Sequence, residues 1–362
     1  MKNVELQKFF RGKRVFVTGH TGFKGSWLCQ MLLQFGAQVW GYALAPDTAP
    51  SLFDLLHLSE RMHSTIGDVR DFDALKLAFF EAQPQIVLHL AAQPIVKEGY
   101  RNPVGTFASN VMGTVHLLEC VRLFGGVESL VNVTTDKVYA ETGRESGYAE
   151  TDVLDGFDPY ANSKSCSELV TACYRRSFLE AVPVSTARAG NVIGGGDFAP
   201  SRIIPDCVRA AQAGEPIVLR NPHSVRPYQH VLEPLIAYLT IAARQCENPA
   251  LAGEYNVGPD ADGCVTTGEL AGLFCDSFGA GMQCIVRSDG GPHEAAFLKL
   301  DCTKLKNTFG WKPVFSVREA VELTTQWTKC WLSGGDLQKL MNEQTAIALQ
   351  RNKGSILSDG CQ

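Results

Sequence analysis

The stretch Thr18-Gly19-His20-Thr21-Gly22-Phe23-Lys24-Gly25 decides the fold of this chain. It follows a short apolar run at residues 14–18 and opens a helical pattern that begins near Ser26. The glycines have the spacing GxxGxxG, and glycine lets the backbone approach a pyrophosphate at a helix N-terminus, where free N–H groups and the helix dipole favour anions. Because the turn joins a strand to a helix, it predicts a dinucleotide site and not merely a structural turn.

From residue 13 onwards, short apolar runs alternate with longer helical patterns. This alternation is typical of repeated βαβ units and predicts an α/β fold with a doubly wound parallel sheet that helices cover on both faces. The expected strands are residues 14–18, 38–42, 62–66, 86–90, 129–134 and 184–189, and the expected helices are residues 25–35, 71–82, 103–123 and 160–179.

The regular alternation of strands and helices ends after Asn191, where three consecutive glycines at 194–196 and several prolines separate shorter elements. We expect this part to form a smaller C-terminal α/β lobe that binds the substrate over the strand ends. The predicted division is a dinucleotide-binding domain with the catalytic residues at 9–190, a mainly substrate-binding lobe at 191–335 with segments that return to the first domain, and a C-terminal helix and tail at 336–362.

The composition favours a globular enzyme and excludes two classes of partner. The 362 residues are 45% hydrophobic, which suffices for a sizeable core. The formal charge is −5, and no run of Lys or Arg is long enough for nucleic-acid binding. The N-terminus lacks a signal-peptide pattern, and no apolar run approaches the roughly 18 residues of a membrane span. We therefore expect a cytoplasmic protein without nucleic-acid or membrane partners.

The twelve cysteines have irregular spacing. Cys29, Cys120, Cys166 and Cys207 lie in apolar or helical stretches, so we interpret the cysteines as reduced thiols. No CxxC pair or histidine-rich partner accompanies them, and the sequence therefore predicts no metal site.

Two further motifs carry chemistry. The sequence Tyr160-Ala161-Asn162-Ser163-Lys164 places a phenol and an amine four residues apart on one helical face. A Lys ammonium favours the phenolate, so we expect Tyr160 to accept a hydroxyl proton close to neutral pH. The other motif, Thr135-Asp136-Lys137, follows a strand and offers a hydroxyl, a carboxyl and an amine. Both motifs should meet at the carboxyl edge of the sheet, although the second could also be a helix cap or a solvated loop.

The end of the second strand bears on the choice of dinucleotide. No acidic residue stands at Gly41-Tyr42-Ala43-Leu44, and Asp47 is the nearest carboxylate. No Arg is placed to take a 2′-phosphate, which favours NAD over NADP. After the third strand, Asp68 and Val69 are placed to meet the adenine, with an N-cap or turn role for Asp68 as the alternative.

Together these motifs resemble the extended short-chain dehydrogenases, and among them the sugar-nucleotide 4,6-dehydratases. The stretches 19–28, 158–164, 188–197, 226–234 and 293–301 extend the likeness, which covers roughly residues 9–331. Lys137 discriminates between subgroups, since dTDP-glucose and GDP-mannose dehydratases typically carry Glu at the matching position. The likeness is strongest to the CDP-glucose 4,6-dehydratases.

The resemblance implies a Rossmann fold and NAD-dependent dehydration of a nucleotide-linked hexose. Tyr160 would take the proton of the sugar 4-hydroxyl, with Thr135 holding the oxygen and Lys164 lowering the phenol pKa. Asp136 would be the general acid, and Lys137 either the C5 base, which requires a depressed pKa, or a stabilising cation. A homodimer through helices 103–123 and 160–179 is also implied. The other expected cofactor residues are Leu90, Ala91, Ala92 and Asn110, and the expected substrate residues are Gln93, Asn191, Arg202, Arg226, His293 and Glu294.

Three alternatives stay open at the level of sequence. A GDP- or dTDP-linked sugar, including an acetamido sugar, could be the substrate of the same reaction. A sugar-nucleotide 4-epimerase uses the same Tyr/Lys pair but needs no acid and base for elimination, so Asp136 with Lys137 argues against it. A cofactor-binding protein that has lost catalysis would bind NAD without turnover.

Overall fold

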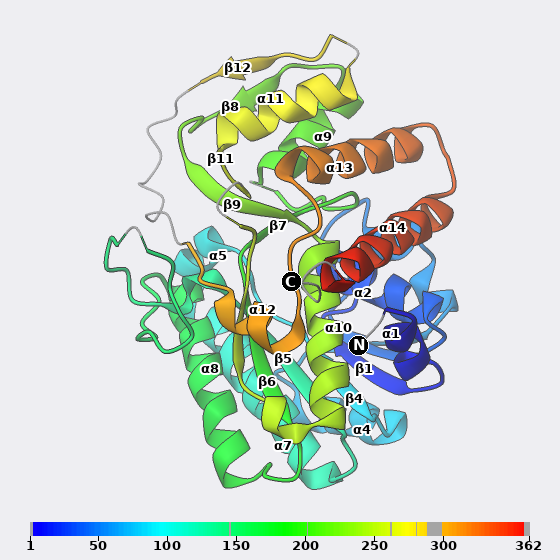
Figure 1. Ribbon diagram of the computed structural model, residues 1–362, viewed down its shortest axis with the longest axis vertical. Helices are drawn as coiled ribbons and strands as arrows, with labels where there is room; N and C mark the ends of the chain where they lie inside the picture. The colour runs from blue at the N-terminus through cyan, green and yellow to red at the C-terminus, as the bar shows by residue number, and fades with distance from the viewer. Residues whose placement is uncertain are drawn as a thin grey trace.

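The computed structural model describes residues 3–144, 146–200, 202–260, 263–279, 281–287 and 299–357. Its centre is a seven-stranded parallel sheet with the order β3-β2-β1-β4-β5-β6-β10 (Figure 1). The predicted doubly wound sheet is thereby confirmed, and the expected strands agree with the structure to within one residue. The strands are β1 (Arg14–Thr18), β2 (Gln38–Ala43), β3 (His63–Ile66), β4 (Ile86–His89), β5 (Ser129–Thr135), β6 (Val184–Ala189) and β10 (Glu254–Val257).

The strand order reverses at β1, which lies between β2 and β4. In an open parallel sheet, ligands bind in the crevice at such a reversal, beyond the carboxyl ends of the strands. Thr18 at the end of β1 is in register with His89 at the end of β4, and Thr135 of β5 is in register with Ala189 of β6. The loops that carry the predicted motifs therefore leave the sheet at one edge.

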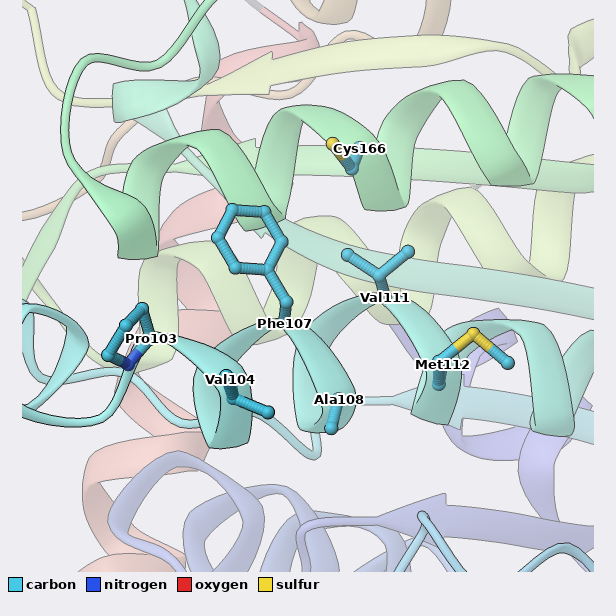
Figure 2. A pocket seen from close by; sticks show the side chains of 7 residues that line it. All are labelled: Pro103, Val104, Phe107, Ala108, Val111, Met112 and Cys166. Carbon is cyan, nitrogen blue, oxygen red and sulfur yellow. The ribbon is translucent and has the colours of Figure 1, made fainter.

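One face of the sheet carries α4 (Phe72–Ala82), α7 (Gly113–Phe124) and α8 (Pro159–Ser177). The helix expected at 103–123 is divided into α6 (Pro103–Phe107), a π-helical turn at Ala108–Met112 and α7. This segment and α8 border an open apolar hollow (Figure 2). The residues lining this apolar hollow are Pro103, Val104, Phe107, Ala108, Val111, Met112 and Cys166.

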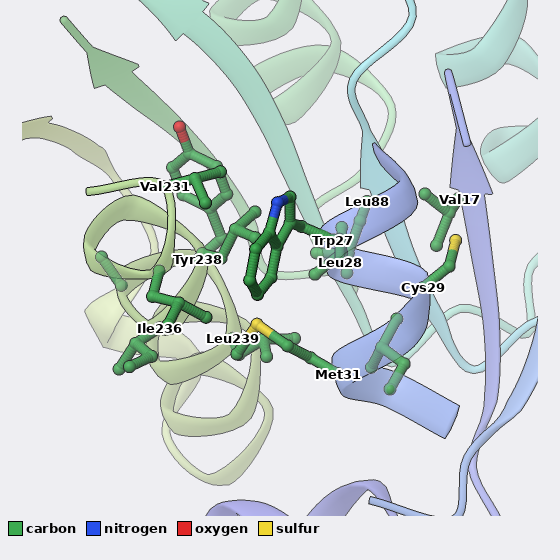
Figure 3. Packing of buried hydrophobic residues seen from close by; sticks show 14 of the residues in the cluster. Val17, Trp27, Leu28, Cys29, Met31, Leu88, Val231, Ile236, Tyr238 and Leu239 are labelled. Atoms are coloured by element: carbon green, nitrogen blue, oxygen red, sulfur yellow. The ribbon is translucent and has the colours of Figure 1, made fainter. Parts of the chain in front are cut away.

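The other face carries α1 (Asn3–Phe10), α2 (Phe23–Gln34), α10 (Leu232–Glu247) and α14 (Leu337–Leu357). Eight consecutive residues of α2, from Gly25 to Leu32, are buried, because the helix lies between the sheet, α10 and α14. In Figure 3, Trp27 and Met31 of α2 lie against Tyr238 and Leu239 of α10. The largest apolar cluster of the described residues thus packs directly beneath the glycine-rich turn.

A smaller lobe lies over the carboxyl edge of the sheet (Figure 1). It holds the sheet β11-β9-β7, the pair β12-β8 and three helices around an apolar cluster of its own. Its elements are β7 (Asn191–Ile193), α9 (Ile203–Ala213), β8 (Ile217–Leu219), β9 (Val225–His230), β11 (Cys264–Thr266), α11 (Thr267–Phe278), β12 (Cys284–Val286) and α13 (Val317–Leu332).

The chain crosses between the two parts more than once. β10 follows β9 in the sequence but pairs with β6 in the main sheet, and α14 buries Met341 and Leu349 in the main core. The division at residues 190 and 335 stays a prediction. The remaining short elements are α3 (Leu52–Leu55), α5 (Val96–Arg101), α12 (Thr303–Phe309) and the 3-10 turns Leu58–Glu60, Asp136–Val138 and Pro249–Leu251.

Two observations bear on expectations from composition. Among the helices that the structure describes, none combines the length and the apolar character needed to cross a membrane. The described cysteines are free thiols, and two of them, Cys275 and Cys284, have their sulfur atoms 3.4 Å apart.

Candidate active site

The glycine-rich turn has the geometry that a dinucleotide requires. Gly19 has a φ of +76°, and a Cβ there would lie 2.8 Å from the Ala91 nitrogen, while a Cβ at Gly25 would lie 2.0 Å from the Gly19 carbonyl oxygen. A Cβ at Gly22 would meet only that oxygen, at 3.5 Å. Gly19 and Gly25 are therefore fixed by packing, whereas Gly22 leaves open the N-terminus of α2, where backbone N–H groups attract a pyrophosphate. The helix begins at Phe23, earlier than expected.

Buried hydrogen bonds hold the walls of this turn. The Thr18 hydroxyl accepts from the backbone N–H groups of Leu90 and Ala91, both at 3.2 Å, and lies 2.6 Å from His89 Nδ1. Burial lowers the pKa of His89 to about 3, so its ring is neutral. Thr21 donates to the Leu44 carbonyl at 2.8 Å. The loop with Leu90, Ala91 and Ala92 is thus fastened against the turn.

The two residues expected to contact the adenine, Asp68 and Val69, already make contacts within the protein. The Asp68 carboxylate accepts from the backbone N–H and the guanidinium of Arg70, at 2.9 and 2.8 Å, so Asp68 has the turn role that the sequence left open. Its carbonyl accepts from the Tyr42 hydroxyl at 3.1 Å, and Val69 is buried. Asp47 is exposed. Contacts of Asp68 and Val69 with adenine stay a prediction.

The two catalytic motifs meet at the carboxyl edge of β5. The Asp136 carboxyl oxygen Oδ1 accepts from the Thr135 hydroxyl at 2.9 Å and lies 3.2 Å from Lys137 Nζ. On α8, Lys164 Nζ donates to the Val133 carbonyl at 3.0 Å. Tyr160 lies close enough for Thr135, Asp136 and Lys137 to influence its phenol. The structure therefore brings the five predicted catalytic residues together.

The loop after β6 closes the site around Asp136. A Cβ at Gly190 would lie 3.0 Å from Asp136 Oδ2, so a side chain there would press on the carboxylate. Gly190 lies within the stretch 188–197, but its contact with Asp136 depends on the pairing of β5 with β6, which the sequence does not show.

The electrostatics of the site differ from the sequence expectation in two respects. Burial raises the pKa of Tyr160 above its usual value and outweighs the opposing effects of Lys137 and a hydrogen bond with Thr135. For Lys137, burial favours the neutral amine, but the Asp136 carboxylate and Tyr160 prevail and raise the pKa. The protein alone thus gives neither a phenolate near neutral pH nor a neutral Lys137.

Several cations surround these groups. Burial lowers the pKa of Lys164 to about 8, against the influence of Glu168. Burial and the positive charges of Arg202 and Lys164 lower the pKa of Lys24 to about 8 as well. A concentration of positive charge of this kind favours a phosphate group or a phenolate.

Two predicted ligand residues use their amides within the protein. The Gln93 side chain donates to Thr106 Oγ1 at 2.8 Å and accepts from the Ile95 N–H at 2.5 Å. Asn110, in the π-helical turn, bonds both backbone groups of Gln93 and donates to Ser163 at 2.8 Å. These amides fasten the loop after β4 to α8. Direct contact with cofactor or substrate stays a prediction for both.

Three further predicted substrate residues lie on the smaller lobe. Asn191 is half-buried at the start of β7, Arg226 is on β9, and Arg202 precedes α9 with its guanidinium 3.2 Å from Asp197. His293 and Glu294 lie outside the described residues. In the ranges that the structure describes, no group of His, Cys, Asp or Glu side chains could hold a metal ion.

Comparison with known proteins identifies the family. A family model described as GDP-mannose 4,6 dehydratase matches residues 16–324. The chain is 44% identical to a CDP-glucose 4,6-dehydratase of Salmonella typhimurium over 91% of this chain and 94% of that protein.

Two solved structures extend the comparison. One is the dTDP-glucose 4,6-dehydratase of Bacillus anthracis in complex with NAD, with a TM-score of 0.72, 22% identity and coverage of 87% and 96% of the two chains. The other is the UDP-glucose 4-epimerase of Thermus thermophilus with NAD, with a TM-score of 0.74, 28% identity and coverage of 87% and 98%. The resemblance predicted from the motifs is confirmed, and the chain belongs to the GDP-mannose 4,6-dehydratase family of sugar-nucleotide enzymes.

Proposed function

We propose that this protein is an NAD-dependent 4,6-dehydratase that converts CDP-glucose into CDP-4-dehydro-6-deoxyglucose. The observation that carries the proposal is the Asp136–Lys137 pair, with 3.2 Å between carboxyl oxygen and amine, beside Tyr160. Oxidation at C4 needs only a base such as Tyr160, whereas loss of water needs an acid and a second base. The 44% identity to the Salmonella CDP-glucose 4,6-dehydratase supports the choice of nucleotide.

The residues present suit NAD. The open backbone at Gly22 and the first turn of α2 would hold the pyrophosphate, and the loop 90–92 would form a wall of the site. Bound there, NAD would supply the hydride acceptor for C4 of the sugar and, once reduced, the hydride donor for C6, so the cycle would consume no cofactor.

The first task of the protein is to remove the proton of the 4-hydroxyl. Tyr160 would accept it, with the Thr135 hydroxyl holding the same oxygen. Because burial holds the phenol pKa high, the surrounding cations have to stabilise the phenolate. Lys137 and Arg202 act on Tyr160 in this sense. The resemblance assigns the same effect to Lys164.

The second task is to eliminate water across C5 and C6. The 4-keto group acidifies the C5 proton, and a neutral Lys137 amine would accept it. Within the pair, transfer of one proton from Lys137 Nζ to Asp136 Oδ1 gives a neutral amine and a carboxylic acid together. Asp136 then protonates the departing 6-hydroxyl, which leaves as water. The pair thus supplies both the base and the acid. When C6 receives the hydride, the Lys137 ammonium would return a proton to C5, and the raised pKa of Lys137 keeps that proton on the amine in the meantime.

A substrate panel tests the function. The purified protein is incubated with CDP-glucose, dTDP-glucose, GDP-mannose and GDP-N-acetylglucosamine, with and without added NAD. The product is followed by the alkaline absorbance of a 4-keto-6-deoxy sugar. We expect product from CDP-glucose. Product from another nucleotide sugar alone would correct the substrate, and a 4-epimer as the only product would overturn the dehydratase assignment.

We also propose that the protein acts as a homodimer through the apolar hollow between α6, the π-helical turn and α8. Val104 is 80% exposed and Met112 is 46% exposed, so part of this surface faces solvent in a single chain. The apolar hollow of a second copy would cover it.

We also propose the cytoplasm as the compartment of this protein. The free thiols of the described cysteines support this proposal.

A further inference from the structure

A fully buried ion pair lies below the catalytic motifs. Arg188 Nη2 of β6 is 2.9 Å from Glu168 Oε2 of α8, and each side chain is only 2% exposed. Burying two charges costs several kcal/mol of desolvation, and such pairs add little stability compared with apolar residues of similar size. The position of this pair therefore calls for an explanation other than stability.

Glu168 joins the catalytic helix to the strand that carries Thr135. It follows Lys164 by one helical turn, so both side chains lie on the same face of α8. Its Oε1 accepts from the Thr134 hydroxyl at 2.5 Å, and Oε2 accepts from the Thr186 hydroxyl at 2.6 Å. Thr134 immediately precedes Thr135, and Glu168 thereby fixes the start of the catalytic segment Thr135–Lys137.

Arg188 fixes the other end of the same segment. Its Nη1 donates to the Tyr139 hydroxyl at 2.8 Å and to the Glu150 carbonyl at 3.1 Å. Tyr139 directly follows the 3-10 turn Asp136–Val138, and its hydroxyl donates to Asn256 Oδ1 at 2.5 Å. The two partners of one ion pair thus anchor the residues immediately before the segment and just after it.

Three titratable groups near Lys164 give its ammonium no negative partner. Lys24 of α2 adds positive charge, His89 of β4 is neutral, and Tyr160 is a neutral phenol on the same helix. Glu168 is the carboxylate that favours the protonated amine, against the effect of burial. Glu168 is therefore placed both to anchor β5 and to keep Lys164 charged.

We infer that Glu168 and Arg188 are positioning residues of the active site, which hold the segment Thr135–Lys137 at both ends, and that Glu168 also supplies the negative counterpart of Lys164. This inference rests on the proposed function, since it assigns a task to groups that act in dehydration. Neither residue needs to touch the substrate.

The Glu168→Gln variant tests the electrostatic part. Glutamine keeps the size and one acceptor oxygen but removes the charge. Lys164 should then lose its proton at lower pH, and the basic limb of the kcat profile should move down by about one pH unit, with a smaller change in KM. The double variant Glu168→Gln/Arg188→Met removes both charges, avoids an unpaired buried Arg, and should keep the shifted profile.

A matched control lies on the same helix. Arg175 lies near the C-terminal end of α8, far from Lys164, and is 2.6 Å from Glu254 of β10. The variant Arg175→Met/Glu254→Gln should leave the pH profile unchanged. A wild-type profile in the double variant at Glu168 and Arg188, once folding is verified by thermal unfolding, would overturn the inference and leave the pair a purely structural role.

A second readout separates this inference from the proposed function. A carbon NMR titration of the Lys164 side chain reports its pKa without turnover, and Glu168→Gln should lower that pKa. An inactive wild type with this shift present would count against the dehydratase proposal only. An active wild type with an unshifted Lys164 would count against the role of Glu168 only.

Discussion

The ammonium nitrogen of Lys137 lies 3.2 Å from Oδ1 of Asp136, the same oxygen that accepts the Thr135 hydroxyl at 2.9 Å. The acid and the base of the proposed elimination are thus adjacent residues that share a proton. Neither has the protonation state it needs until that proton moves. This arrangement separates oxidation, which depends on Tyr160, from elimination, which depends on the pair.

Replacing Lys137 by Ala should stop the reaction after the first step. Tyr160, Thr135 and the cation Arg202 remain, so C4 oxidation should still reduce the cofactor, although more slowly because Lys137 no longer stabilises the phenolate. Overall kcat should fall by about 10²–10⁴-fold because the C5 base is lost. Stopped-flow absorbance of the reduced cofactor would detect the accumulation. If Lys137 acts only as a cation, exchange of the C5 proton with deuterated water should persist. A variant unable to reduce NAD would contradict the division of labour.

Two glycines of the turn should respond differently to alanine. A Cβ at Gly25 would collide with the Gly19 carbonyl, so Gly25→Ala should fold poorly. A Cβ at Gly22 meets only one atom, at 3.5 Å, so Gly22→Ala should fold but bind NAD more weakly, because the methyl group occupies the approach of the pyrophosphate. Thermal unfolding and calorimetric titration with NAD measure the two effects. Unchanged NAD affinity in Gly22→Ala would argue against this binding mode.

The N-cap of α8 should matter to catalysis as well as stability. Asp158 Oδ1 accepts from the N–H groups of Tyr160 and Ala161, at 2.9 and 3.0 Å. Asp158→Ala should cost about 1 kcal/mol of stability and lower kcat, because the first helical turn carries Tyr160. Asp71→Ala removes an equivalent cap from α4 and is the control. An equal loss of kcat in both variants would point to a general effect of stability.

Glu233 should make stability depend on pH near neutrality. Burial raises its pKa to about 7, although its carboxylate accepts from the N–H groups of Val314 and Phe315, both at 2.8 Å. A raised carboxyl pKa gives stability that is present below the unfolded value and lost as the pH rises through 7. Wild type should therefore lose stability relative to Glu233→Gln between pH 5 and pH 8 in thermal unfolding. A constant difference would contradict the assigned pKa.

As a control, a different carboxylate should show the opposite dependence of stability on pH. Arg122 lowers the pKa of Glu119, so the stability that Glu119 contributes is lost as the pH falls. Compared with Glu119→Gln, wild type should gain stability with rising pH at the acid end, by a small amount because this pair is partly exposed.

A charge in the apolar hollow should dissociate the proposed dimer. Met112→Lys places an ammonium where a second copy would pack, and analytical ultracentrifugation should report monomers where wild type forms dimers. Leu77 of α4 is 71% exposed and lies outside the hollow, so Leu77→Lys is the control. A monomeric wild type, or a dimer that survives Met112→Lys, would rule out this surface.

Much of the fold could be predicted because its signals are local. The apolar runs placed six strands to within one residue, and the glycine turn and the YxxxK pair indicated the edge where they meet. The seventh strand, β10, joins the sheet only after the chain has passed through the smaller lobe, outside the regular alternation of strands and helices. The π-helical turn at Ala108–Met112 interrupts a pattern that predicted one helix. Both features depend on contacts that the local sequence pattern does not contain.

The sequence indicated which residues form the site better than it indicated their pKa values and hydrogen bonds. The pKa directions of Tyr160 and Lys137 depend on burial and on distances that only folding determines. The amides of Gln93 and Asn110 bond to the protein itself, which their positions in the sequence did not indicate. Glu168 could have been found, since the spacing from Lys164 predicts a shared helical face.

The most direct test of the dehydratase account follows one hydrogen atom. CDP-glucose carrying deuterium at C4 is converted by the enzyme, and the product is analysed by NMR and mass spectrometry. The account predicts deuterium in the C6 methyl group of a 4-keto product, because the hydride taken from C4 is returned within the same site. Deuterium retained at C4 of an epimerised sugar would contradict it and identify the reaction as epimerisation.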